Sequence, residues 1–189
     1  MIDKARQSDA DMLLLDLDDA VVYEDAAKVG AQQAMHRAVS TLDFTGKEVV
    51  VRINSIDTPW WQEDLRFCVE AGVRTVMPTK ANNPEDLMAV VRHLDGLPGG
   101  DTVRLWPMIE TTGAIVNCEL IASQVPRLAG MCFGIGDYTV SVGAQFIDTP
   151  DRVSYPLGKM VCVARYHGLT PLAPAVAFTN FKSDAVIAE

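Results

Sequence analysis

Residues 12–19 read MLLLDLDD, a largely apolar run that ends in Asp16, Asp18 and Asp19. A short apolar run of this kind is typical of a strand that is covered on both faces, as in a parallel sheet. Residues 25–42 follow with apolar side chains at helical spacing. The stretch therefore predicts a buried strand over residues 12–17, with an acidic carboxyl end and a helix after it.

The same cycle of strand and helix repeats along the rest of the chain. Further strands are expected over residues 49–54, 75–79, 103–109, 128–134 and 169–176. Further helices are expected from Pro59 behind a Thr58 cap, from Pro84 to residue 94, over residues 114–124 and over residues 155–166. Strands that alternate with helices indicate βαβ units and a parallel sheet. The choice lies between a (β/α)8 barrel and a doubly wound open sheet.

The glycine pattern disfavours a doubly wound nucleotide-binding sheet. Gly134 and Gly136 form G-x-G, but Thr139 stands where the third glycine of a dinucleotide loop would be. The sequence has no Walker A motif either. We therefore expect an α/β fold of the (β/α)8 TIM-barrel type, with residues 1–189 in a single domain.

Composition narrows the class of protein. The net charge of −9 over 189 residues disfavours nucleic-acid binding, which needs a basic face. No apolar run approaches the roughly 18 residues that span a bilayer, and the charged first residues do not resemble a signal peptide. The four widely spaced cysteines predict small buried residues in a reducing cytoplasm. We expect a cytoplasmic protein whose partner is a small molecule, with no nucleic acid and no membrane.

Polar side chains follow five consecutive predicted strands. They are Asp16, Asp18 and Asp19 after the first strand, Arg52 and Asn54 after the second, Lys80 after the third, Glu110, Thr111 and Thr112 after the fourth, and Asp137 after the fifth. A single charge in such a place is usually a solvated loop residue or a helix cap. In a parallel barrel, however, all these ends open onto one face. Five in succession therefore predict a shared polar pocket.

The residue types in this pocket indicate its chemistry. Glu110 and Asp137 offer two carboxylates, which with water and substrate can complete a Mg²⁺ site. A divalent cation polarises a 2-oxo acid and stabilises an enolate. The planar fork of Arg52 suits a substrate carboxylate. Lys80 could attract a phosphate or carboxylate, or could simply be solvated.

Asp18, Asp19 and the positions of the histidines bear further on the predicted chemistry. Asp18 and Asp19 could orient a metal-bound water or take part in proton transfer, with helix capping as the alternative for Asp19. His36, His93 and His167 all fall in predicted helices rather than at strand ends. This placement disfavours a histidine-based zinc site, a Ser-His-Asp hydrolase and a Cys-His enzyme.

Four motifs resemble a known family. LDLDDAV at residues 15–21 is similar to D-L-E-D-A-V, and VVVRIN at 49–54 is similar to V-R-[IV]-N. PMIETTGAIVN at 107–117 is similar to I-E-T-x-x-[AG], and FGIGDYTVSVGA at 133–144 is similar to F-G-x-x-D-x-x-x-x-[LV]-G. Their order across nearly the whole chain resembles the citrate lyase beta-subunit-like, or HpcH/HpaI aldolase, family.

The resemblance implies a magnesium-dependent carbon–carbon lyase on a barrel. Such enzymes cleave or form a 3-hydroxyacyl-CoA thioester, such as citryl-, malyl- or citramalyl-CoA, with acyl-CoA and a 2-oxo acid as the other side of the reaction. A homo-oligomer, trimeric or hexameric, is the implied assembly. Carried over by motif, the metal ligands are Glu110 and Asp137, the catalytic residues are Asp18, Asp19 and Arg52, and the substrate-binding residues are Arg52, Lys80 and Thr111.

The sequence also departs from the family pattern. Asp18 replaces the usual glutamate, and P-T-K at residues 78–80 stands where P-K is usual. Only about six strands can be counted, so the expected barrel is incomplete, without its first and last strands and its C-terminal lid. Two other functions stay open. One is a non-catalytic subunit or remnant derived from the family, and the other is a class II 2-oxo-acid aldolase, which typically uses a histidine base.

Overall fold

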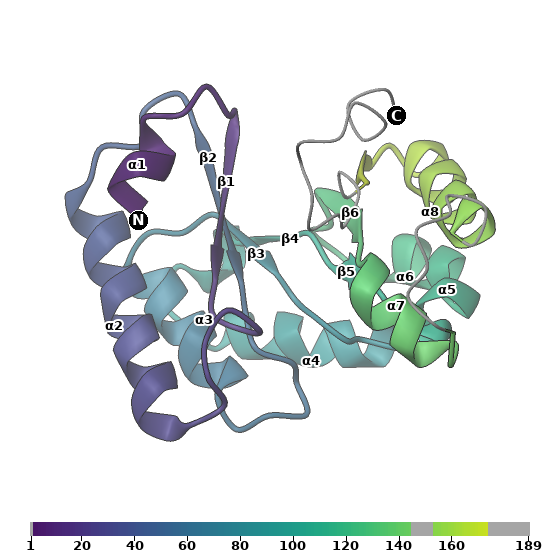
Figure 1. Cartoon of the computed structure of the whole chain (residues 1–189), viewed down its shortest axis with the longest axis horizontal. Coiled ribbons are helices and arrows are strands. Elements are labelled where there is room, and N and C mark those ends of the chain that lie inside the picture. Colours follow the sequence, from purple (N-terminus) through teal and green to yellow (C-terminus); the bar gives the residue numbers. More distant parts are fainter. Residues whose placement is uncertain (1, 145–152, 174–189) are drawn as a thin grey trace.

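The computed structural model of the chain describes residues 2–144 and 153–173. Its strands form two parallel sheets, in the orders β1-β2-β3-β4 and β5-β6-β7 (Figure 1). The strands are β1 (Met12–Asp16), β2 (Glu48–Arg52), β3 (Thr75–Met77), β4 (Arg104–Leu105), β5 (Met108–Ile109), β6 (Gly130–Phe133) and β7 (Thr170–Leu172). The parallel α/β fold that the sequence predicts is confirmed.

Strands β4 and β5 are two halves of one strand position, which the sequence predicts as a single strand over residues 103–109. Pro107 lies between them and has no N–H to continue the ladder. On one side, the N–H of Met108 still donates to the carbonyl of Pro78 beyond β3. On the other side, Leu105 forms a parallel bridge with Leu128 ahead of β6. The two sheets therefore continue one another in sequential strand order, without the reversal of a doubly wound sheet.

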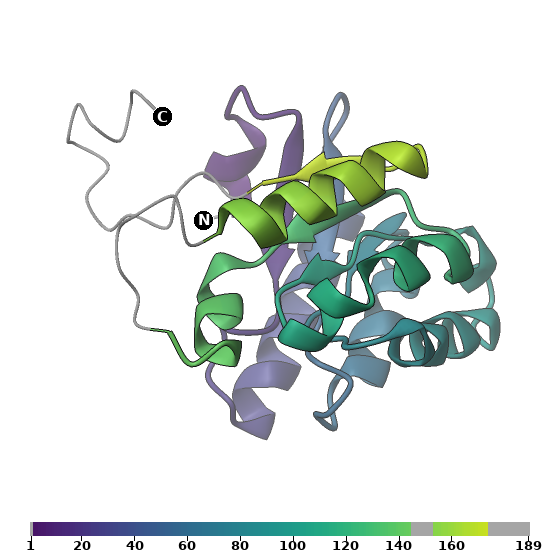
Figure 2. The same ribbon diagram turned by 90° about the vertical axis from the view of Figure 1, so that its right-hand side faces the viewer.

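The helices follow the same sequential order. Along the chain, α2 packs on α3, α3 on α4, α4 on α6 and α6 on α8, and Figure 2 shows α8 running alongside β7. None of the described helices is both long and apolar enough to cross a membrane. The helices are α1 (Ile2–Arg6), α2 (Asp25–Thr41), α3 (Trp61–Glu70), α4 (Pro84–Asp95), the 3-10 helix η1 (Gly100–Thr102), α5 (Thr112–Val116), α6 (Cys118–Gln124), α7 (Ile135–Ser141) and α8 (Ser154–Tyr166).

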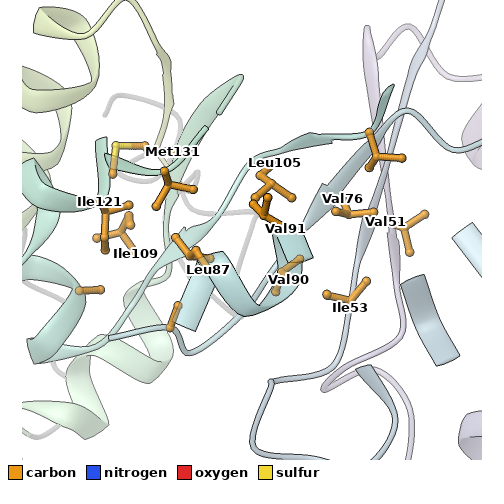
Figure 3. Packing of buried hydrophobic residues seen from close by; sticks show 14 of the residues in the cluster. Val51, Ile53, Val76, Leu87, Val90, Val91, Leu105, Ile109, Ile121 and Met131 are labelled. Carbon is orange, nitrogen blue, oxygen red and sulfur yellow. The ribbon is translucent and has the colours of Figure 1, made fainter. Parts of the chain in front are cut away.

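The main hydrophobic core lies between the strands and these helices. In Figure 3, Val51 and Val76 of the sheet face Leu87 and Val90 of α4. Each such buried side chain contributes roughly 1.5–3 kcal/mol to folding. The opposite face of the sheet carries a second, smaller cluster of Val50, Met77, Trp106, Met108 and Cys132. Because side chains alternate along a strand, Arg52 falls on the same face as Val50, at the carboxyl end of β2.

Helix boundaries depart from the sequence prediction in two places. The helix expected from Pro59 begins at Trp61, because Thr58 donates its N–H and its hydroxyl to the carbonyl of Ser55 and forms a turn instead. The helix expected over residues 114–124 is divided at Asn117 into α5 and α6. By contrast, the predicted start of α4 is confirmed, with the side chain of Asn83 accepting from the backbone N–H of Asp86.

Two further expectations are settled in part. The last predicted strand reaches only Leu172 within the described residues, and positions 174–176 lie outside them. Cys68, Cys118 and Cys132 are buried, as predicted, whereas Cys162 is exposed on α8. The prediction of four buried cysteines is therefore wrong at that position, which lies on the solvent side of its helix.

Candidate active site

Seven charged residues from the ends of successive strands gather at one end of the sheet, and we call them the strand-end cluster. Ion pairs, one backbone contact and mutual electrostatic influence connect them. All residues that the sequence predicts as catalytic or metal-binding belong to this cluster. Its members are Asp16, Asp18, Asp19, Arg52, Lys80, Glu110 and Asp137.

Arg52 is held on both sides of its guanidinium group. Its Nε and Nη2 donate to the two carboxylate oxygens of Asp16 at 2.8 and 2.5 Å, while its Nη1 lies 3.4 Å from Asp19. Burial acts to lower the pKa of Arg52, but the hydrogen bonds and charges of these two aspartates outweigh it and raise the pKa. Sequence reasoning gave Asp16 no role. The signal lies in the strand register, which places Asp16 directly opposite Arg52.

The two aspartates after β1 differ sharply in exposure. Asp18 is fully buried, where it accepts a hydrogen bond from the hydroxyl of Tyr23 at 2.5 Å and one from Nζ of Lys80 at 3.0 Å. Asp19 also receives Nζ of Lys80, at 3.2 Å, but 47% of its side chain is exposed. Of the predicted pair, only Asp19 therefore presents a substantial surface to a ligand.

A buried lysine supports this loop from behind. Lys28 on α2 is 1% exposed, and its Nζ donates to the carbonyls of Leu17 and Asp18, both at 2.8 Å. The same Nζ lies 4.2 Å from the ring centroid of Tyr23, and burial lowers the pKa of Lys28. The supporting role was missed from the sequence. Its signal is helical spacing, because Lys28 shares one buried face of α2 with Gln32 and Met35.

Replacing Lys28 by methionine should lower the free energy of unfolding by about 2–3 kcal/mol, because buried carbonyls lose a charged donor. Lys47 provides a matched control. Its Nζ also donates to two carbonyls, those of Ser8 and Ala10, but at an exposed position. The Lys47→Met variant should therefore lose less than about 1 kcal/mol. Urea unfolding of both variants measures the difference, and equal losses would contradict a supporting role for Lys28.

A second buried network fixes the end of β2. Asp64 on α3 is fully buried and accepts from the backbone N–H and the side-chain amide of Asn54, at 2.8 and 2.7 Å. Its other oxygen accepts from Gln32 on α2 at 2.7 Å. Burial raises the pKa of Asp64 even though these donors act in the opposite direction. The network ties two helices to the segment that directly follows Arg52.

Glu110 is a buried carboxylate that directly follows β5. It is 1% exposed, and its Oε1 accepts from the backbone N–H of Lys80 at 2.8 Å. Burial, together with the charge of Asp137, raises the pKa of Glu110 to about 8, against the lowering effect of that N–H and of nearby cations. Gly134, which directly follows the neighbouring strand β6, lies so close that an added Cβ would meet Oε2 of Glu110 at 2.4 Å. The close approach of β6 thus helps to define the carboxylate's position.

Two carboxylates of the cluster could hold a hard cation. Glu110 is buried at the end of β5, and Asp137 is half-buried in the first turn of α7. Across residues 2–144 and 153–173 there is no group of three or more His, Cys, Asp or Glu side chains arranged to bind a metal ion. Mg²⁺ commonly uses only one or two protein carboxylates and takes its other ligands from water and substrate.

Other residues singled out from the sequence lie around this cluster. The hydroxyl of Thr111 caps α5 by accepting from the N–H of Ala114, and it donates to the carbonyl of Ala81 at 3.3 Å. A contact between Thr111 and substrate therefore stays a prediction. His36 and His93 lie within α2 and α4, as the sequence predicts, whereas His167 directly follows α8 instead of lying in a helix. None of the three belongs to the strand-end cluster.

A groove of about 400 Å³ lies at the opposite end of the strands, next to the starts of β2 and β4. Its charged side chains already have partners. Arg104 pairs with Glu48 at 2.8 Å, and Lys47 donates to backbone carbonyls. None of the residues predicted to bind substrate or metal lines it. The strand-end cluster, rather than this groove, therefore carries the candidate chemistry.

The chain is similar in sequence to curated proteins of known activity. The (3S)-malyl-CoA thioesterase of Cereibacter sphaeroides is 34% identical over 171 residues, which cover 89% of this chain and 56% of the relative. The L-malyl-CoA/beta-methylmalyl-CoA lyase of the same species is 35% identical over 152 residues, which cover 77% of this chain and 47% of the relative. The chain thus spans about half the length of these curated relatives.

A solved structure shows the same fold. The citrate lyase beta subunit of Mycobacterium tuberculosis, complexed with oxaloacetate and magnesium, superposes with a TM-score of 0.72 at 23% identity. The superposition covers 90% of this chain and 70% of that one. Residues 1–182 also match the sequence pattern shared by the HpcH/HpaI aldolase/citrate lyase family. The chain belongs to the HpcH/HpaI aldolase/citrate lyase family.

Proposed function

We propose that this chain carries the active site of a magnesium-dependent carbon–carbon lyase. The substrate would be a 3-hydroxyacyl-CoA thioester of the citryl-, malyl- or citramalyl-CoA kind, cleaved to or formed from acyl-CoA and a 2-oxo acid. The site would lie on a (β/α)8-type barrel, of which residues 2–144 and 153–173 supply six sequential strand positions. The observation that carries the proposal is the buried carboxylate of Glu110, placed beside Asp137 at the strand ends.

The residues present fit a magnesium ion. The strand-end cluster has five carboxylates and two cations, and the ion pairs of Arg52 and Lys80 reach only Asp16, Asp18 and Asp19, so Glu110 and Asp137 have no cation of their own in the cluster. Both burial and the neighbouring Asp137 oppose the charge on Glu110, and a divalent cation would offset that cost. Glu110 and Asp137 would hold the ion. When bound, it would polarise the oxo-acid oxygen and offset enolate charge.

The chain's own side chains would bind and orient the substrate around that ion. Arg52 would hold a carboxylate through Nη1, because its Nε and Nη2 already donate to Asp16. Asp19, which is half exposed and 3.4 Å from Arg52, would accept or return the proton of the substrate's 3-hydroxyl oxygen. The burial of Asp18 favours Asp19 for this proton transfer.

Specific observations favour or disfavour three other functions. A thioesterase is the second candidate, because one relative with 34% identity is named a (3S)-malyl-CoA thioesterase. A class II aldolase is less favoured, because the strand-end cluster contains no histidine to serve as base. A non-catalytic subunit would not need Glu110, Arg52 and Asp19 to converge as they do.

The products formed from (3S)-malyl-CoA separate these functions. The purified protein is incubated with the thioester, with Mg²⁺ or with EDTA, and the products are identified by mass spectrometry. A lyase should give acetyl-CoA and glyoxylate only when Mg²⁺ is present, since the bond between the thioester α-carbon and the hydroxyl carbon breaks. Malate and free CoA would instead support the thioesterase. No turnover of malyl-, citryl- or citramalyl-CoA would sink both enzymatic functions.

A further inference from the structure

Lys80 adopts a backbone conformation that is unusual for a residue with a side chain. Its φ is +57°, in the left-handed region that few non-glycine residues occupy. In this conformation its N–H donates to Oε1 of Glu110 at 2.8 Å. Strained backbone of this kind persists where surrounding contacts over-determine it, and it is concentrated at functional sites. The conformation thus aims one backbone donor at a candidate metal ligand.

The contacts of the Lys80 side chain indicate a second role for this residue. Its Nζ lies 3.0 Å from Asp18, 3.2 Å from Asp19 and 3.5 Å from the hydroxyl of Tyr23, with 27% of the side chain exposed. Glycine would adopt the same backbone conformation with less strain. The contacts of the ammonium group therefore give a reason for lysine at this position that the backbone does not.

No neighbouring cation of the described site can take over this role. Arg52 is held by Asp16, and its remaining contact to Asp19 is 3.4 Å long. Lys28 is directed at the carbonyls of Leu17 and Asp18 rather than at a carboxylate. Among the described residues, Lys80 is the cation that contacts both Asp18 and Asp19, and its own amide contacts Glu110.

We propose that Lys80 is a positioning residue with two separate functions. Its backbone N–H orients Glu110, and its ammonium group is an internal counter-ion that keeps Asp18 and Asp19 away from the metal. Metal binding is thereby restricted to Glu110 and Asp137. This inference rests on the proposed magnesium site, and it assigns Lys80 a role other than the substrate contact expected from the sequence.

Magnesium titration without substrate tests the inference. Calorimetry is run on the wild type and on Lys80→Met, Lys80→Gly and Lys80→Arg. The Met and Gly variants should bind Mg²⁺ about tenfold more tightly, because two nearby carboxylates lose their counter-ion. Glycine keeps the backbone conformation, so its increase shows that the ammonium is responsible. The Arg variant keeps the charge and should stay within about threefold of the wild type.

A second measurement covers variants that fold less well. Thermal unfolding with EDTA and with saturating Mg²⁺ should show a larger metal-induced rise in Tm for Lys80→Met than for the wild type, as tighter binding requires. A wild type that binds no Mg²⁺ would refute the proposed metal site itself. A wild type that binds Mg²⁺, with Met and Gly variants of equal or weaker affinity, would overturn only the role of Lys80. Weakened oxaloacetate binding at unchanged Mg²⁺ affinity would instead assign Lys80 to the substrate.

Discussion

The Glu110→Gln variant should bind no measurable Mg²⁺ and should lose at least about a thousandfold in kcat. Glutamine keeps an oxygen that can accept the N–H of Lys80, so the local hydrogen bond survives while the charge is removed. Calorimetric titration with Mg²⁺ and steady-state assay with malyl-CoA measure the two effects. Glu119 on α6 is exposed, and the Glu119→Gln variant is the matched control, with both quantities unchanged. Full activity of Glu110→Gln would show that the Glu110 carboxylate is not needed for catalysis, and would contradict the proposed mechanism.

The same substitution should stabilise the metal-free protein at high pH. Folding raises the pKa of Glu110 from its ordinary 4.5 to about 8, because the carboxylate is buried beside Asp137. For an acid with a raised pKa, stability is greatest below pH 4.5 and is lost as the pH rises towards 8. Glutamine does not titrate. In EDTA at pH 9, the variant should therefore exceed the wild type by about 2–4 kcal/mol in urea unfolding. A less stable variant at pH 9 would contradict the burial of this charge.

The approximate position of the site could be predicted because parallel strands share one carboxyl end. Arg52 and Glu110 are 58 positions apart in the sequence, yet Arg52 is the last residue of β2 and Glu110 directly follows β5. The sequential order of the strands brings these two ends together. The hydrophobic pattern fixes where each strand ends, and the polar residue that follows is then located without any knowledge of long-range contacts. Their roles as substrate clamp and metal ligand remain predictions.

The pairings within the site could not be predicted in the same way. Which carboxylate neutralises Arg52 depends on strand register, which places Asp16 opposite it, and the sequence alone does not single out Asp16 among the three aspartates that follow or end the strand. The burial of Lys28 depends on how α2 rests against the loop after β1. Both are tertiary effects, and local propensity carries no information on them.

The point at which a regular element is interrupted also depends on tertiary contacts that the sequence does not show. The apolar run over residues 103–109 is read as one strand, but Pro107 divides it because the ring cannot donate to a ladder. The residue type was visible in advance. The effect of Pro107 depends on whether a neighbouring strand needs a backbone N–H at that position, and this follows only from how the strands pair. The division leaves Glu110 directly after the short β5, beside the glycine that begins the segment after β6.

That glycine, Gly134, should not tolerate even a methyl group. An alanine Cβ would lie 2.4 Å from Oε2 and 2.5 Å from Cβ of Glu110, distances that force β6 or the carboxylate to move. Gly134→Ala should therefore cost about 1–3 kcal/mol in stability and weaken Mg²⁺ binding at least about tenfold.

Gly136 offers a matched control two residues away, because its added Cβ would meet nothing within 4 Å. Gly136 lies inside α7, where alanine is the better helix former, so Gly136→Ala should be neutral or stabilising by up to about 1 kcal/mol. The two variants add the same methyl group to the same G-x-G segment, and only at Gly134 does that group meet Glu110. Thermal unfolding and Mg²⁺ calorimetry on both would show whether the close approach of Gly134 sets the position of Glu110. Wild-type Mg²⁺ affinity in Gly134→Ala would show that Glu110 can bind the ion from a displaced position, and the tight contact with β6 would then serve packing alone.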